Sequence, residues 1–245
     1  MEQTYFFDIH CHLVPGVDDG ARDMKESLAA LKEEYDQNVR WIICTPHMAA
    51  DLGLEAAEKI KASFKELAYH LKKTDFGNEL ELYLGCEIMY SESLLERLEI
   101  GEVWTMAGSS YILIEFFPSV SYEELYHGVR RLAAGGYIPI LAHIERYRCL
   151  YKEPGRIREL QEIGAYCQIN ASSIRGSIFN QKTAYIRKLC QLGLVHFIGT
   201  DSHGLLYRPP DIKKGGKWLT RNCNPLLKYK LLYQNGLDLL EDIII

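Results

Sequence analysis

Side chains that bind metal ions recur along the whole chain of 245 residues, and they begin near its amino terminus. His10 and His12 stand two residues apart, directly after a short apolar run. Residues i and i+2 of an extended strand point to the same face, so this pair can hold one ion while Cys11 faces elsewhere. Asp201 and His203 have the same spacing, and we expect the same geometry there.

Between these two pairs, further ligand-type residues follow one another at intervals of about one β-α unit. They are His47, Glu87, Glu115 and His143, with Asn170 at the equivalent place in the sixth unit. Imidazole and carboxylate ligands without thiolate are typical of hydrolytic zinc, manganese or iron centres. More than four candidates indicate more than one ion. A single histidine of this kind would usually be structural, and it is their joint placement that favours a metal centre.

The remaining three histidines, His70, His127 and His196, fall within predicted helices or in the middle of a predicted strand. We expect them to have structural roles. Cys11 and Cys86 stand beside ligand candidates, but a buried cysteine more often behaves as a small apolar residue, and we expect that here.

The elements that must position the ligands are seven apolar, β-rich runs separated by amphipathic stretches. The runs are almost continuously hydrophobic, as parallel strands covered by helices are. They span residues 5–9, 41–45, 80–84, 111–116, 138–142, 165–169 and 195–199. Capping residues Asp23 and Ser121 and apolar stripes of helical spacing predict helices between them. The alternation predicts an α/β barrel or doubly wound sheet in one domain, 1–245, with the site at the carboxyl ends of the strands.

Composition narrows the class of partner. The net charge is -5 and the basic residues are scattered, which disfavours nucleic acid. The one compact basic run, Lys213, Lys214 and Lys217, is interpreted as a solvated loop. Seven cysteines without a Cys-x-x-Cys pair argue against a disulfide framework and suit the reducing cytoplasm. Met1 to Phe7 is too short and polar for a signal peptide, and no apolar run reaches the roughly 18 residues of a membrane span, so no membrane insertion is expected.

Taken together, the ordered motifs resemble the polymerase and histidinol phosphatase (PHP) superfamily, over nearly the whole chain. More narrowly, they resemble its bacterial manganese-dependent protein-tyrosine phosphatases of capsular and exopolysaccharide synthesis, of the CpsB/YwqE kind. The segments that carry this likeness are Asp8 to His12, Val17 to Gly20, Ala142 to Tyr147, Gln168 to Asn170 and Arg208 to Pro210.

The resemblance implies a distorted (β/α)7 barrel of the PHP/TIM-like type with three divalent ions, manganese first, with iron or zinc as alternatives. The implied ligands are His10, His12, Asp19, His47, Glu87, Glu115, His143, Asp201 and His203. Asp19 is chosen over its neighbour Asp18 from the family pattern alone. Arg146 and Arg208 match the family's phosphate-side arginines.

The implied reaction is hydrolysis of phosphotyrosine by metal-bound hydroxide, with Glu87 bridging two ions and the two arginines holding phosphate oxygens. The implied substrate is an autophosphorylating, membrane-associated tyrosine kinase that controls polysaccharide export. The thiol-based route to the same reaction is excluded, because no cysteine begins a Cys-x5-Arg motif. A histidinol phosphatase, another phosphatase of small phosphomonoesters, or an inactive regulatory binding module remain the alternatives, and the oligomeric state stays open.

Overall fold

Each of the seven predicted runs forms a strand in the computed structural model, which describes residues 5–177 and 179–245. Residues 1–4, to which the domain and amino-terminus predictions extend, lie outside this range. The strands pair in parallel, in the orders β1-β2-β4 and β3-β5-β6-β7-β8-β9. They are β1 (Phe6–Cys11), β2 (Val39–Cys44), β3 (His47–Met48), β4 (Glu81–Leu84), β5 (Glu87–Met89), β6 (Tyr111–Glu115), β7 (Ile138–Leu141), β8 (Tyr166–Asn170) and β9 (Phe197–Gly199).

Two of the predicted runs continue past a break into a second short strand. β2 leads through Pro46 into β3, and β4 leads through Gly85 into β5. Backbone hydrogen bonds from Gly85 N to Cys44 O (2.8 Å) and from Glu87 N to Pro46 O (3.1 Å) carry the pairing across both breaks. The two sheets are therefore parts of one curved sheet, bent where proline removes a ladder donor.

The other end of this sheet meets its beginning. Asp201 N donates to His10 O and His12 N donates to Ser202 O, both at 2.8 Å, so the chain after β9 pairs with the end of β1. The ring of parallel strands is closed. Of the two architectures that the alternation allowed, the barrel is confirmed and the open doubly wound sheet is wrong.

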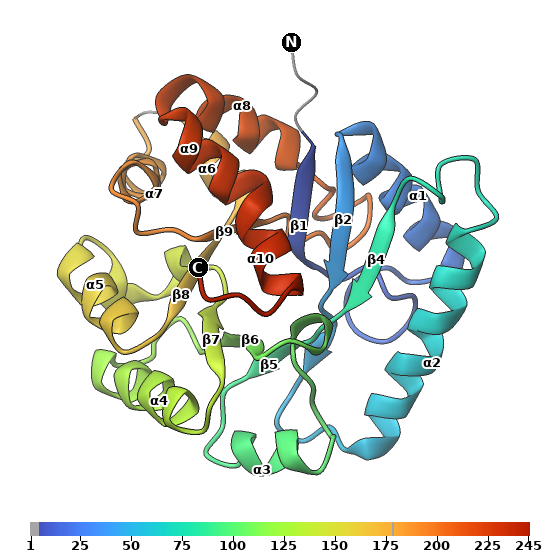
Figure 1. The fold of residues 1–245 in the computed structure, drawn as a ribbon, viewed down its shortest axis with the longest axis horizontal. Coiled ribbons are helices and arrows are strands. Elements are labelled where there is room, and N and C mark those ends of the chain that lie inside the picture. Colours follow the sequence, from blue (N-terminus) through green and yellow to red (C-terminus); the bar gives the residue numbers. More distant parts are fainter. Residues whose placement is uncertain (1–4, 178) are drawn as a thin grey trace.

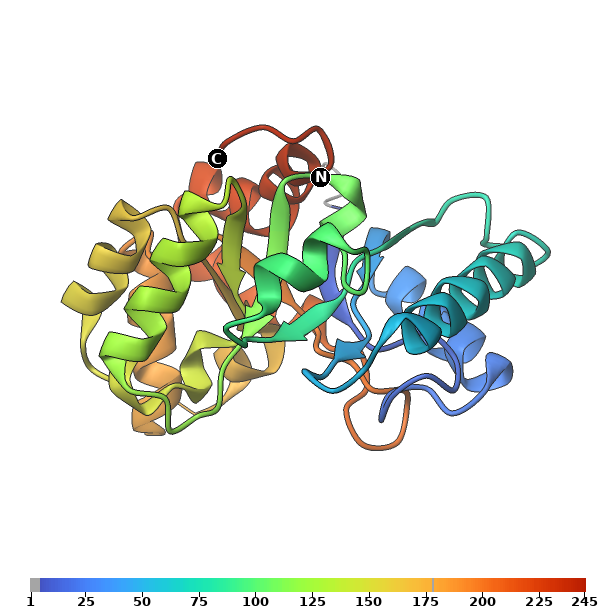
Figure 2. The ribbon, with the colours of Figure 1, turned by 90° about the horizontal axis from the view of Figure 1, so that it is seen from below.

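Helices surround the ring (Figure 1). Figure 2 shows α1 and α2 on one side and α4 and α5 on the other. The helices are α1 (Met24–Asp36), α2 (Leu54–Leu71), α3 (Leu94–Glu99), α4 (Tyr122–Ala134), α5 (Pro154–Glu162), α6 (Ala171–Arg175), α7 (Gln181–Gln191), α8 (Ile212–Asn222), α9 (Pro225–Tyr229) and α10 (Asn235–Leu240). The predicted caps are confirmed: Asp23 Oδ1 accepts from Glu26 N (2.8 Å) and Ser121 Oγ accepts from Glu124 N (3.1 Å).

Apolar residues fill two regions, one inside the ring and one between the ring and its helices. Phe7, Ile9, Leu113 and Ile140 belong to the inner cluster. The carboxyl-terminal residues close the amino-terminal end of the barrel, since Tyr111 Oη donates to the carbonyl of Ile243 (2.6 Å) at the start of β6. The opposite end of the barrel is the one where the strands deliver the ligand candidates.

The basic run at 213–217 lies in a helix, so the predicted loop is wrong, whereas the predicted solvent exposure of its three lysines is confirmed. Lys213, Lys214 and Lys217 lie in α8, which includes the two glycines of the run. A Cβ at Gly215 would lie 3.0 Å from the carbonyl oxygen of Ala171, so Gly215 lets α8 pack closely on α6, and Gly216 packs against the ring of Phe6. Close packing overrode the helix-breaking tendency of the two glycines. Among the described residues, none of the helices has the length and hydrophobicity of a membrane span.

Candidate metal centre

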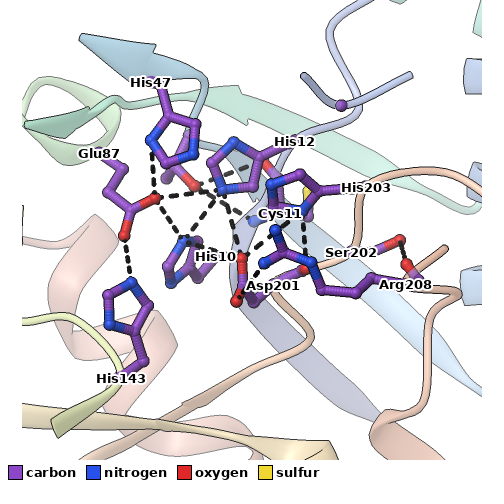
Figure 3. Close-up of polar contacts among 12 residues, drawn as sticks. His10, Cys11, His12, His47, Glu87, His143, Asp201, Ser202, His203 and Arg208 are labelled. Atoms are coloured by element: carbon purple, nitrogen blue, oxygen red, sulfur yellow. Dashed lines mark hydrogen bonds and ion pairs between the residues drawn. The ribbon is translucent and has the colours of Figure 1, made fainter. Parts of the chain in front are cut away.

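The nine predicted ligands come together at the carboxyl end of the barrel. Figure 3 labels His10, His12, His47, Glu87, His143, Asp201 and His203 among them. Within each group, one nitrogen or oxygen atom of every member lies within 4.8 Å of those of the others. The groups are His12, Asp19, His47 and His203; His10, His12 and Asp201; His10, Glu87 and His143; and His47, Glu87 and Glu115. Four residues belong to two groups each, so the groups are continuous with one another.

Gln168 fixes which nitrogen of His10 faces the centre. The backbone N–H of His143 donates to Gln168 Oε1 (2.6 Å), which establishes that atom as the amide oxygen. His10 Nδ1 lies 3.2 Å from the same oxygen and must therefore carry the proton. The lone pair of neutral His10 is then on Nε2, which lies 3.2 Å from Glu87 Oε2.

Asp18 does the same for His12. Its Oδ2 accepts from His47 N (3.0 Å) and lies 2.9 Å from His12 Nδ1, and its Oδ1 accepts from Gly20 N (3.0 Å). Burial would raise the pKa of Asp18, but His12 and these N–H donors lower it to about 2. His12 Nε2 is thus free to face Glu87 Oε2, at 3.2 Å.

The neighbouring carboxylate lies differently, because the Asp19 side chain is 66% exposed. Its Oδ1 lies 3.5 Å from His47 Nε2 and 3.4 Å from His203 Nε2. Asp19 therefore faces the ligand cluster, whereas Asp18 lies behind it and orients a histidine, a second-layer role that metal sites commonly use.

His143 and His203 reach the centre from irregular backbone. His143 has φ of 32° and Asp201 has φ of 52°, in the left-handed region that non-glycine residues rarely adopt. β9 ends at Gly199, so the expectation that Asp201 and His203 share one face of a strand is wrong. The loop holds His203 instead, through Nδ1 donating to Asp201 O (2.9 Å), which leaves Nε2 toward Asp19.

Glu87 is the buried carboxylate at the middle of the cluster. Its Oε1 lies 2.6 Å from His143 Nε2, and its Oε2 is 3.2 Å from the facing nitrogens of His10, His12 and His47. Burial would raise the pKa of Glu87, but the surrounding histidines hold it well below its usual range. Glu87 Oε2 and His203 Nε2 are buried without a hydrogen-bond partner among the described residues.

Asp201 links the cluster to the two predicted arginines. Arg146 and Arg208 both contact its Oδ2, Arg208 at 2.8 Å. Asn170 Nδ2 donates to the same oxygen at 2.7 Å. Burial opposes the charge of Asp201, but His12, His10 and Arg146 lower its pKa far below the ordinary value. The other carboxylate oxygen faces His10 and His12, at 3.8 and 3.5 Å.

The sequence marks Asn170 at the end of a predicted strand but assigns no role at the site to it, to Asp18 or to Gln168, although all three stand in the quoted motifs. The available signals were the position of Asp18 beside Asp19 in sequence and the positions of Gln168 and Asn170 at the end of the sixth predicted strand. The cysteines lie apart from the cluster, since Cys11 Sγ donates to Ile43 O (3.8 Å) and Cys86 Sγ to Trp104 O (3.0 Å).

The three histidines expected to be structural lie outside the ligand groups found among the described residues. His70 and His127 are on helix surfaces beside Glu66 and Glu123. His196 precedes β9, where its Nδ1 accepts from Cys167 N (3.1 Å).

Comparison with known proteins places these features in a family. The family model for capsular polysaccharide synthesis, CpsB/CapC, matches residues 6–241. The tyrosine-protein phosphatase CpsB of Streptococcus pneumoniae is 33% identical over 243 residues, which cover 97% of this chain and 99% of that protein.

Solved structures agree on the fold. One from a study of YwqE from Bacillus subtilis and CpsB from Streptococcus pneumoniae, described there as metal-dependent tyrosine phosphatases, superposes with a TM-score of 0.86. It shares 30% identity and covers 98% of this chain and 96% of its own. A histidinol phosphate phosphatase from Lactococcus lactis has a TM-score of 0.54 and 15% identity, covering 88% and 91%, which indicates a common fold only.

Proposed function

The chain belongs to the CpsB/CapC family of capsular polysaccharide synthesis, and we propose that it is a manganese-dependent protein-tyrosine phosphatase. Its substrate is a phosphotyrosine-bearing, membrane-associated tyrosine kinase that regulates polysaccharide export. We place it in the cytoplasm, where a reducing medium suits the seven unpaired cysteines.

The observation that carries this proposal is the convergence of acceptor atoms in a buried space. The free nitrogens of His10 and His12 lie 3.2 Å apart and both face Glu87 Oε2. Lone pairs of neutral imidazoles and a carboxylate cannot satisfy one another, so this arrangement of acceptors favours bound cations. Nitrogen and oxygen ligands with no thiolate fit manganese, iron or zinc.

We assign three ions to the nine residues named above, the number that the family resemblance implies, and the four side chains shared between groups are consistent with neighbouring ions. Such ions, when bound, lower the pKa of coordinated water and hold the oxygens of a phosphate ester. Glu87, shared by two of the groups, is the bridging carboxylate of this proposal.

The arginines have a separate task at the edge of the cluster. Asp201 holds Arg146 and Arg208 together, and their side chains are 36% and 43% exposed. Guanidinium groups so placed bind the non-bridging oxygens of a phosphate and stabilise the charge that develops on them. The phenolate of tyrosine is a good leaving group, so the main demand is to bring a nucleophile to an anion.

The first test compares hydrolysis of a phosphotyrosyl peptide with that of histidinol phosphate, in manganese and after chelation, with elemental analysis of the purified protein. We expect three ions per chain and peptide hydrolysis that chelation abolishes and manganese restores. A preference for histidinol phosphate would favour the small-molecule alternative. Absence of both activities in a fully loaded protein would favour the binding module.

The second test addresses the arginines. Arg146→Ala and Arg208→Ala are each expected to lower kcat about 100-fold at unchanged metal content, the scale of losing one donor to a developing anion. Arg158→Ala, an exposed arginine of α5, is the matched control. Turnover equal to that of the parent in Arg146→Ala would contradict the proposed role.

A further inference from the structure

A polar groove of about 690 Å³ extends from the metal centre over the neighbouring loops. It begins at Arg146, Asn170 and Arg208, which all contact Asp201 Oδ2. Beyond these residues, its lining includes Arg148 and, at the start of α7, Lys182. The groove is thus continuous with the place where a phosphate would bind.

The two distal cations are not needed by the metal centre. Arg148 and Lys182 are exposed, and neither side chain has an ion-pair or hydrogen-bond partner among residues 5–177 and 179–245. Glu145 is the one carboxylate in the lining, and its Oε1 is engaged by Asn170 N (2.9 Å) and Ser173 Oγ (2.6 Å). In a chain of net charge -5, this groove concentrates positive charge.

The size of the groove also exceeds what a single phosphate requires. Volumes of several hundred Å³ hold ligands of many atoms. In an extended peptide, side chains two residues apart lie on one face about 7 Å from each other. A phosphotyrosine at the metal centre would therefore place a neighbouring side chain of its own peptide in the groove.

We propose that Arg148 and Lys182 form a subsite for a second anionic side chain of the same substrate peptide, and that they set the preference of the enzyme among phosphotyrosine sites. This deepens the proposed function and rests on it. The shared chemistry is a carboxylate or phosphate group, which arginine can bind in bidentate fashion and lysine as a point charge.

The test uses three peptides with one phosphotyrosine in common, flanked by serine, by glutamate or by a second phosphotyrosine two residues away. For the parent enzyme with manganese, kcat/KM should be about 3- to 10-fold higher for the anionic peptides, mainly through KM. Added salt should reduce this ratio. Comparison of the glutamate-flanked with the phosphotyrosine-flanked peptide shows whether the subsite prefers a carboxylate or a phosphate group.

In the double variant R148Q/K182Q the ratio should fall close to one. Lys188→Gln is the matched control, because Lys188 is an exposed lysine of the same helix, α7, and does not line the groove. Melting temperature and metal content verify that each variant folds. A ratio retained in R148Q/K182Q, or a ratio of one in the parent, would overturn the proposal.

Failure of the proposed function gives a different result, namely no hydrolysis even of the serine-flanked peptide. Fluorescence anisotropy of the same labelled peptides in the presence of chelator decides the subsite in that case. The parent should bind the doubly phosphorylated peptide more tightly than the serine-flanked one, and R148Q/K182Q should lose this difference. If this difference in affinity were absent from both proteins, or equally large in both, the result would count against the subsite.

Discussion

At the scale of single residues, Asp18 and Asp19 are adjacent in the sequence but have different surroundings and different proposed roles. The Asp18 side chain is 5% exposed and accepts from His12 and two backbone N–H groups, whereas Asp19 is mainly exposed and faces the ligand nitrogens. The family pattern selected Asp19 as the ligand. The physical reason for that choice is visible only in the hydrogen bonds.

The first prediction concerns Asp18→Asn. This change removes the negative charge that holds the His12 tautomer and raises its basicity, so we expect manganese affinity to fall about 10-fold or more. Metal content after dialysis against defined free manganese measures it. Asp36→Asn, which alters an exposed partner of Lys32, should retain the affinity of the parent. Identical binding curves for the two variants would contradict the orienting role.

At the scale of elements, the junction of β1 with β9 determines where His10 lies. The register of β1 against β2 is irregular between Asp8 and Cys11, the stretch that contains His10. Gly199 lies against this junction, where an added Cβ would be 2.6 Å from His10 Cβ and 3.1 Å from Gln168 Nε2. The site therefore depends on a position without a side chain.

Gly199→Ala should consequently lower the free energy of unfolding by about 1–3 kcal/mol and also reduce metal content, since the methyl group displaces His10 or Gln168. Chemical denaturation and elemental analysis measure the two effects. Gly155→Ala is the control, because a Cβ there has no neighbour within 4 Å. A stable, fully loaded Gly199→Ala variant would show that the junction tolerates movement.

The next prediction concerns pH and His196, beside β8 and β9. Burial, with a smaller effect of Lys230, lowers the pKa of His196 to about 4 from the ordinary 6.5. The unfolded chain then binds more protons between these values, so stability is present above pH 6.5 and is lost as pH falls toward 4. The full effect is about 3 kcal/mol.

In His196→Asn, an amide oxygen can accept from Cys167 N in place of the imidazole nitrogen and does not titrate. We expect the loss of unfolding free energy between pH 6.5 and 5 to be about 2 kcal/mol smaller than in the parent. Urea denaturation at each pH measures it. Parallel pH profiles of the two proteins would exclude His196 as the source.

At the scale of the whole molecule, the metal centre ties together loops from all around the barrel. The ligand candidates stand at or just after the carboxyl ends of β1, β2, β4, β6, β7 and β9, and Glu87 stands at the buried middle of the cluster. Acceptor groups that face one another without a cation repel, so bound ions should stabilise the native ring far more than the unfolded chain.

We therefore expect chelation to lower Tm and manganese to restore it in a concentration-dependent manner. A ligand at about 1,000 times its Kd adds about 4 kcal/mol of stability. Differential scanning calorimetry with manganese titration measures the shift, and Glu87→Gln should respond less. A Tm that is the same with chelator and with manganese would contradict a preorganised metal site.

The sequence alone was sufficient to predict the seven β-α units and the order in which ligand-type residues stand at the ends of their strands. Hydrophobic runs and caps are local signals, and parallel strands bring their carboxyl ends to one side of a sheet. These signals allowed a barrel or an open doubly wound sheet, and the pairing of the chain after β9 with β1 decided for the barrel. The ligand roles stay predictions, supported by the convergence of all nine side chains.

The tertiary structure alone decided the finer arrangement. The tautomer of His10 depends on Gln168, and the left-handed backbone of His143 and Asp201 depends on surrounding hydrogen bonds. One groove is lined by both Arg148 and Lys182. Each of these involves residues far apart in the chain, whose contacts form only when the ring closes. Neither periodicity nor spacing carries that information.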